Sequence, residues 1–452
     1  MNTIDLSERI EQLFSSQPRN GADATTLWHK RAKIEKGLSQ LLKARSQNIC
    51  IDGPTGSGKS SLALTVLNKI SQPYIWLPLA NDMQWTDLCE DLAARAWEID
   101  TKLTNHQAAH LAISLDAQKT ITAADILMPW KLLDRITFDI NTASLDLVSL
   151  RKQARSWNIT DVENFLHANN LCLVIDDFEK ATPNLVVKVA NLCKRLTFRT
   201  SQKCLIIGTG ETFARLYSSD EGLDGRLAEL SVASFGSKSE VWHYLSDGFE
   251  RLNFDTPRAM LKHKIIPKVD ADRIEIALYE AADGMPKYIN ELALRICHTV
   301  LDEHNVAHGA MKITPAVLLK ECAQMLDENV SRCGQQIRKA EKSLRSCIEL
   351  RMVLRAVFEL GANGVHRVSS LVSHIERSLG EKFSYDQFMA GLDELRQLGL
   401  YVQTGKLGEV VFAKDPMFSH VLGLICHDPE RYNRNKDVFG LFGQRSLPLL
   451  VA

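Results

Sequence analysis

The sequence predicts an α/β protein with a mostly parallel β-sheet covered by helices on both faces, followed by two smaller domains. Short apolar runs alternate with helical patterns in the first half of the chain, which is typical of strands buried between helix layers. A glycine-rich turn joins the first of these runs to the helix after it. Helical periodicity dominates after residue 238, which indicates a separate helical domain.

Length and composition indicate a globular protein with two or three domains. The chain has 452 residues, of which 45% are hydrophobic and 24% are charged. Lys and Arg total 54 against 55 for Asp and Glu, so we expect any nucleic-acid contact to be local. Because the sequence contains neither a signal peptide pattern nor an apolar run long enough to span a bilayer, it predicts a cytoplasmic protein without membrane contact.

The cysteines predict no metal or disulfide framework. Ten are scattered along the chain without a C-x-x-C pair, and several lie inside apolar runs. We therefore expect buried free thiols in a reducing compartment.

The sheet elements follow in a regular order. After a polar lead, a helix begins near Trp28 and leads to a predicted strand at Asn48–Asp52, a glycine-rich turn and a helix at 60–70. Four further apolar runs predict strands at Tyr74–Leu79, Leu171–Ile175, Cys204–Ile207 and Ala228–Val232. The segment at about 81–170 is longer than one crossover helix, so we interpret it as a helical insertion.

The remainder of the chain is predicted to be mainly helical. Helical patterns recur at 240–252, 257–263, 271–282 and 286–304, and again at 350–360, 368–379 and 384–398, before a strand pair at 401–404 and 410–413. The predicted domains are an N-terminal lead (1–27), a sheet domain (28–236), a helical lid (237–330), a C-terminal domain (331–430) and a tail (431–452).

The strongest functional motif follows the first strand. Residues Gly53, Pro54, Thr55, Gly56, Ser57, Gly58, Lys59 and Ser60 match the P-loop pattern G-x-x-x-x-G-K-[ST], and Ser61 follows at the start of the helix. The glycines allow backbone N–H groups to point at a phosphate, Lys59 reaches the β- and γ-phosphates, and the Ser60 hydroxyl binds Mg²⁺. The sequence therefore predicts a P-loop NTPase with an ATP and Mg²⁺ site.

A carboxylate is needed beside the phosphates, and the third strand supplies it. The run ends in Asp176 and Asp177, followed two residues later by Glu179. We predict Asp176 as the carboxylate on the metal side and Asp177 as the general base or water-orienting group.

In these motifs the chain resembles the AAA+ and STAND families of ATPases over roughly residues 28–325. The second acidic residue of these families is often Glu, whereas Asp177 is one methylene shorter. Either Asp177 reaches the water less well, or Glu179 shares its role. We therefore expect slow turnover, suited to a switch.

The resemblance implies roles for four more residues. Thr209 follows the fourth strand where these families have a phosphate or water sensor, and Arg226, with Arg215 as second choice, lies where AAA+ proteins present an arginine to a neighbouring subunit. Lys287 follows a G-x-P motif at the start of a lid helix, where a second sensor is common. The alternatives are a hydroxyl at an ordinary strand end, a plain surface arginine and a solvated lysine.

Residues 343–427 resemble the winged-helix module of origin-recognition-type and STAND ATPases in pattern, without a diagnostic motif. The third helix of this region carries Asp386, Asp393 and Glu394, which argues against sequence-specific DNA reading. The basic stretch 332–355 is either a grip for a duplex DNA backbone or a solvated helix face. The apolar tail either folds back or docks on a partner protein.

Three functions are consistent with these features. The first is an ATP-gated switch that controls homo-oligomer assembly or a partner protein, and the second is a DNA-transaction ATPase similar to initiators or transposition regulators. The third, a small-molecule kinase, is disfavoured by the lid and the C-terminal domain. The resemblance also implies a bacterial or archaeal setting in mobile elements or antiviral defence.

Overall fold

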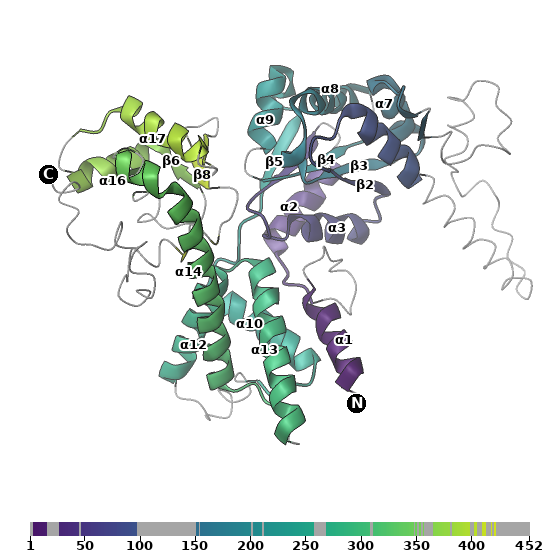
Figure 1. Ribbon diagram of the computed structural model, residues 1–452. Helices are drawn as coiled ribbons and strands as arrows, with labels where there is room; N and C mark the ends of the chain where they lie inside the picture. The colour runs from purple at the N-terminus through teal and green to yellow at the C-terminus, as the bar shows by residue number, and fades with distance from the viewer. Residues whose placement is uncertain are drawn as a thin grey trace, which may run out of the picture. The chain divides into compact units, whose positions relative to one another are not determined.

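The computed structural model describes residues 3–15, 27–44, 47–96, 151–199 apart from 153, 202–209, 212–256, 268–307 and 311–347, and shorter stretches between 349 and 421 (Figure 1). The chain forms two compact units. The sheet unit comprises Arg31–Asp52 and Leu62–Ser231, and the helical unit comprises Met1–Lys30, Gly53–Ser61 and Val232–Ala452. No helix in the described ranges is long and apolar enough to cross a membrane.

The sheet unit contains a five-stranded parallel sheet. Its strands are β1 (Asn48–Asp52), β2 (Tyr74–Pro78), β3 (Cys172–Asp176), β4 (Cys204–Ile207) and β5 (Leu227–Ser231), in the order β2-β3-β4-β1-β5. Every pairing in this sheet is parallel. The three central strands are buried along their whole length, whereas the edge strands β2 and β5 also contain half-buried and exposed residues. This burial explains the continuous apolar runs of the central strands.

Helices cover both faces of this sheet, as the sequence predicted. Figure 1 shows α2 (Ala32–Lys43) and α3 (Lys59–Lys69) on one face, and α7 (Ile159–Ala168), α8 (Pro183–Arg199) and α9 (Thr212–Ser219) on the other. An N-terminal capping box of Asn158 and Asp161 fixes the start of α7. Residues 85–96, at the start of the predicted insertion, are helical, and the rest of the insertion up to residue 150 lies outside the described residues.

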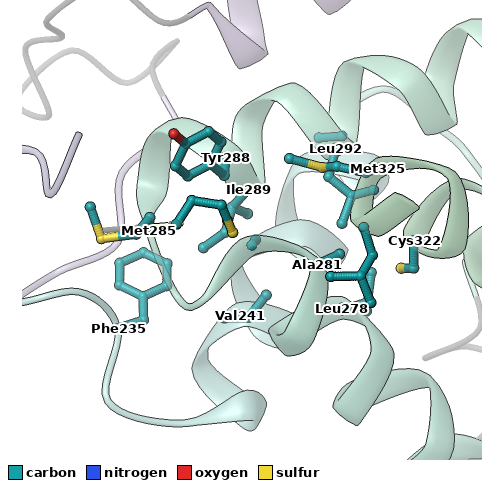
Figure 2. Close-up of a cluster of buried hydrophobic side chains, with 14 of the residues drawn as sticks. Phe235, Val241, Leu278, Ala281, Met285, Tyr288, Ile289, Leu292, Cys322 and Met325 are labelled. Atoms are coloured by element: carbon teal, nitrogen blue, oxygen red, sulfur yellow. The ribbon is translucent and has the colours of Figure 1, made fainter. Parts of the chain in front are cut away.

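The helical unit is built on α10 (Lys238–Arg251), α12 (Lys268–Ala282), α13 (Pro286–Ala307) and α14 (Pro315–Ser346). Their apolar faces form a common core, part of which Figure 2 shows around Leu278, Ile289 and Met325. The first helix of the chain, α1 (Thr3–Phe14), was not predicted; it contacts α13, with Ile10 and Phe14 fully buried. The pattern at 257–263 lies outside the described residues.

The C-terminal part of the helical unit contains α16 (Val368–Leu379), α17 (Tyr385–Gln397) and a small antiparallel sheet. The sheet has the order β6-β8-β7, with β6 at Val365–Arg367, β7 at Val402–Thr404 and β8 at Glu409–Phe412. The two helices and the β7–β8 pair occur where the sequence predicted them, whereas β6 was not predicted. The winged-helix assignment stays a prediction, and the tail at 431–452 lies outside the described residues.

The thiols agree with the sequence prediction in the part of the chain that the structure describes. Eight cysteines are free there, and all except Cys347 are buried. Burial raises the pKa of Cys172 to about 12, so this thiol stays protonated at neutral pH.

Candidate nucleotide site

The loop between β1 and α3 has a backbone shape that glycine permits. Gly53, Gly56 and Gly58 have φ values of 154°, 84° and 88°. A β-carbon on Gly53 would lie 2.2 Å from the carbonyl oxygen of Val232, so this position excludes any side chain on steric grounds as well. These three positions let the chain curl tightly before α3 begins.

Lys59 folds back onto this loop. Its Nζ donates hydrogen bonds to the carbonyl oxygens of Gly53 at 3.0 Å and Pro54 at 2.9 Å, and only 9% of the residue is exposed. An ammonium group buried at the start of α3, where the helix dipole is positive, gives this end of the helix a strong affinity for an anion.

The loop also contains a buried hydroxyl that has no hydrogen-bond partner among the described residues. This atom is the Oγ of Ser57, and the residue is fully buried. Ser60 and Ser61 lie half-buried in the first turn of α3, and Thr55 is exposed at the tip of the loop. The loop therefore presents hydroxyl oxygens beside the Lys59 ammonium.

Two carboxylates mark the carboxyl edge of the sheet. Asp52 ends β1 and Asp176 ends β3, and both are nearly buried at 3% and 7% exposure. Ile206 of β4 pairs with Ile175 on one side and Cys50 on the other, so Asp176 is level with Ile51, one residue before Asp52. The P-loop starts at the residue after Asp52 in the sequence.

The acidic residues after β3 differ in their surroundings. Asp177 has a left-handed backbone with φ of 55°, and its Oδ2 accepts a hydrogen bond from Nζ of Lys180 at 2.7 Å. This bond raises the pKa of Lys180, so the ion pair persists at neutral pH. By contrast, Oε2 of Glu179 is buried and has no hydrogen-bond partner in the described part of the chain. Asp177 is thus bonded to a lysine, whereas Oε2 of Glu179 accepts no hydrogen bond from the described residues.

Arg215 supports this acidic segment from α9. Its guanidinium donates to the carbonyl oxygens of Glu179 at 3.0 Å and Ala181 at 2.7 Å. The sequence offered Arg215 as the second choice for an arginine presented to a neighbour, but the structure places it in a backbone contact within its own chain. It holds the segment that carries Asp177 and Glu179.

Thr209 lies just beyond β4 and is 9% exposed. Its carbonyl oxygen accepts hydrogen bonds from the N–H and the hydroxyl of Thr212, both at 2.9 Å. At the start of the same helix, α9, the N–H of Phe213 donates to Oδ2 of Asp52 at 3.4 Å. Thr209 therefore lies at the carboxyl edge of the sheet, as Asp52 and Asp176 do.

Arg226 lies at the amino ends of the strands, opposite the ends that carry Asp52 and Asp176. It immediately precedes β5, and its carbonyl oxygen accepts a hydrogen bond from the N–H of Asn48, the first residue of β1. Its guanidinium lies 4.2 Å from the centre of the exposed Phe198 ring and donates to the carbonyl oxygen of Gly222. The structure therefore does not bring Arg226 together with the carboxylates of its own chain.

Lys287 meets the P-loop through its backbone. Its N–H donates to the carbonyl oxygen of Gly56 at 3.3 Å, and a β-carbon on Gly56 would lie 2.8 Å from Cβ of Lys287. The ring of Pro286 lies 3.9 Å from the position of a β-carbon on Gly58. Nζ of Lys287 is 5.5 Å from the centre of the Tyr288 ring. The start of α13 thus rests on the loop.

Two features of the site were missed in the sequence. Lys180 received no role, although its position three residues after Asp177 is a weak signal for a pair on one turn. Pro286 was interpreted only as a helix start, and its contact with the P-loop depends on tertiary folding that no local pattern reports.

Comparison with known proteins assigns a P-loop domain to the first half of the chain. Residues 31–209 match the KAP family P-loop domain. No significant match is found among the curated proteins.

Solved structures align over most of the chain at low identity. The Walker-type ATPase PABY2304 of Pyrococcus abyssi has a TM-score of 0.45 and 17% identity, and the alignment covers 90% of this chain and 99% of that one. The ORC2 protein of Aeropyrum pernix has a TM-score of 0.43 and 12% identity, with 92% and 97% covered. The RuvB Holliday junction branch migration motor of Thermotoga maritima has a TM-score of 0.34 and 12% identity, with 84% and 92% covered.

Proposed function

We propose that this protein is a Mg-ATP-binding ATPase of the AAA+/STAND type, which acts as a nucleotide-gated switch controlling assembly or a partner protein. The observation that carries the proposal is the P-loop, where three glycines with positive φ and a buried lysine precede a helix. The match of residues 31–209 to a P-loop domain supports it independently.

The loop suits a triphosphate because of its charge and its donors. The carbonyl oxygens of Gly53 and Pro54 now hold the Lys59 ammonium, and phosphate oxygens are stronger acceptors for the same group. Lys59 would turn to the β- and γ-phosphates, and the buried hydroxyl of Ser57 would gain a partner. Binding would therefore give Lys59 stronger acceptors and the Ser57 hydroxyl a partner.

The residues of this region also fit Mg²⁺, which prefers hydroxyl, carboxylate and water oxygens. Ser60 would hold the ion directly, and Asp176 would hold it through water at the carboxyl edge of the sheet. When bound, the ion neutralises charge on the β- and γ-phosphates. Lys59, Ser60 and Asp176 then fix the phosphates, while a carboxylate after β3 orients the attacking water.

We favour Glu179 as the residue that orients the attacking water, with Asp177 in a supporting role. The buried Oε2 of Glu179 is open to a new hydrogen bond, whereas Asp177 is held by Lys180. Thr209 is proposed to contact the γ-phosphate or the water from β4. Hydrolysis is proposed to be slow, because Asp177, at the position that directly follows the β3 carboxylate, is one methylene shorter than Glu and is held by Lys180, which leaves the water to Glu179 two residues further on.

The switch is supported by the contact between Lys287 and Gly56. A nucleotide that shifts the backbone at Gly56 would also shift the hydrogen bond from Lys287, which would link the nucleotide state to the position of α13. Arg226 is proposed to act on a neighbouring subunit, since it lies at the opposite edge of its own sheet.

The test is the mass distribution of the protein without nucleotide, with ADP and with a non-hydrolysable ATP analogue, each with and without duplex DNA. We expect assembly with the ATP analogue that Lys59→Ala abolishes, and that Lys69→Ala, at the exposed far end of the same helix, preserves. A monomer under all conditions would refute the assembly switch. Assembly that requires DNA would favour a DNA-transaction ATPase.

A further inference from the structure

His420 joins the C-terminal part of the helical unit to the end of α12 through both ring nitrogens. Its Nδ1 lies 3.0 Å from Oδ1 of Asp283, and its Nε2 lies 2.8 Å from the carbonyl oxygen of Glu280. The side chains of His420 and Asp283 are only 12% and 7% exposed. The carbonyl oxygen of Glu280 is an acceptor, and so is an ionised Asp283, so the ring donates to both when each of its nitrogens carries a proton. The geometry thus favours the protonated form of His420.

The segment that carries His420 is fixed by apolar anchors on either side. Met417 and Val421 are 0% and 1% exposed and belong to the core of the helical unit. Their spacing places them on the same helical face as His420. A shift of the ring would therefore move the whole segment.

Asp283 lies in a turn with little freedom. Asp283 and Gly284 both have left-handed backbones, with φ of 48° and 65°. The carbonyl oxygen of Gly284 accepts a hydrogen bond from the N–H of Phe235, and a β-carbon on Gly284 would lie 2.5 Å from the Phe235 carbonyl oxygen. Figure 2 shows Phe235 beside Met285 at this turn. The turn is thus held by a hydrogen bond and by close packing, both between Gly284 and the backbone of Phe235.

The same turn leads directly into the helix that rests on the P-loop. Only Gly284 and Met285 separate Asp283 from Pro286, the first residue of α13. The next residue, Lys287, donates its N–H to Gly56 of the loop. Three residues therefore separate the carboxylate that holds His420 from the amide that bonds the loop.

Other titratable groups face this pair. Glu280 and Tyr279 come from α12, and Cys322 of α14 interacts electrostatically with Glu280. Glu240 of α10 acts on Tyr279, and Glu321 acts on Cys322. Glu280 acts on His420 directly, and its charge favours a positive charge on the ring.

We propose that the His420–Asp283 pair is a latch that couples the C-terminal segment around residue 420 to the P-loop through the first turn of α13. This inference rests on the proposed function. The latch is the route by which the nucleotide state at the P-loop affects the C-terminal part of the helical unit. A nucleotide that shifts Gly56 moves Lys287, strains the turn and loosens His420. Release of His420 in turn loosens the start of α13.

Hydrogen exchange measured by mass spectrometry on the full chain tests this, using peptides that cover 284–290 and 417–421. The variants are His420→Ala, which removes both hydrogen bonds, and Asp283→Asn, which keeps a residue that tolerates the left-handed turn. The control is His298→Ala, because His298 forms an exposed pair with Glu11 in the same unit. Exchange in β4 reports whether the sheet unit stays folded.

Without nucleotide, we expect His420→Ala to raise exchange in both peptides about tenfold, with Asp283→Asn intermediate and the control unchanged. Faster exchange at 417–421 alone would overturn the coupling. With ADP or the ATP analogue, exchange at 417–421 should change in the native chain and not in His420→Ala. If the native chain fails to bind nucleotide while the first result holds, the proposed function fails and the latch stands.

Discussion

The Nζ of Lys180 donates a 2.7 Å hydrogen bond to Oδ2 of Asp177, so the residue that directly follows β3 carries its own counter-ion. The neighbouring Glu179 keeps a buried oxygen without such a bond in the described part of the chain. This difference decides which carboxylate is free to orient water.

Replacement of these two acids should therefore have unequal effects on hydrolysis. We expect Glu179→Gln to lower the turnover number about 100-fold and Asp177→Asn to lower it less than about tenfold. Phosphate release, together with the affinity for a fluorescent ATP analogue, measures both effects. Equal losses, or a larger loss in Asp177→Asn, would return the role of base to Asp177.

Gly53, the first glycine of the P-loop, can be compared with Gly225, which has a positive φ but no atom close enough to clash with a side chain. Gly53→Ala places a β-carbon 2.2 Å from the Val232 carbonyl oxygen, whereas Gly225 has φ of 69° with nothing within 4 Å. We expect Gly225→Ala to cost about 1 kcal/mol, and Gly53→Ala to cost more and to abolish ATP binding. Thermal unfolding and nucleotide titration check this. Normal binding in Gly53→Ala would mean that the loop has another shape.

An ion pair between a buried glutamate and a half-buried arginine joins α7 and α8 in the sheet unit. Oε2 of Glu163 lies 2.7 Å from Nε of Arg195, and the glutamate side chain is 3% exposed. Arg195→Met leaves that charge without its partner, so we expect a loss of about 2 kcal/mol in unfolding free energy, less than for a fully buried pair because solvent reaches the arginine. The neighbouring Lys194→Met breaks the more exposed pair with Asp220 and should cost less than about 1 kcal/mol. Denaturant unfolding compares them, and similar costs would contradict the argument.

The latch should depend on pH. Burial alone would lower the pKa of His420, but the hydrogen bond and the charge of Asp283 outweigh it and raise the pKa above the usual value. A raised folded-state pKa means that the stabilisation is complete below about pH 6.5 and is lost as the pH rises through the folded-state value. Melting temperatures of native chain and His420→Ala should therefore differ most at acidic pH. A difference that grows towards alkaline pH would contradict this assignment.

Local patterns were sufficient to predict the sheet. The strands Asn48–Asp52 and Cys204–Ile207 were predicted at their observed bounds, because polar residues or turns flank short apolar runs. The strand β6 was missed because three residues carry too little periodicity. The helix α1 was missed because its four buried apolar residues lie within a polar lead.

The site was only partly predictable for a related reason. The P-loop is contiguous, so its spacing alone indicates its chemistry. Asp283 and His420 are 137 positions apart, and no local rule relates them. By contrast, Arg226 lies at the amino ends of the strands because it directly precedes β5 of a parallel sheet.

The length of α14 has a mechanical consequence. Its 32 residues span about 48 Å, and its first half is packed in the core through Leu318, Cys322 and Met325. A tilt of about 10° about the packed half near Cys322 would move the far end near Ser346 by about 6 Å. The helix is thus a lever arm, whose far end moves farther than the half that is packed beside α13.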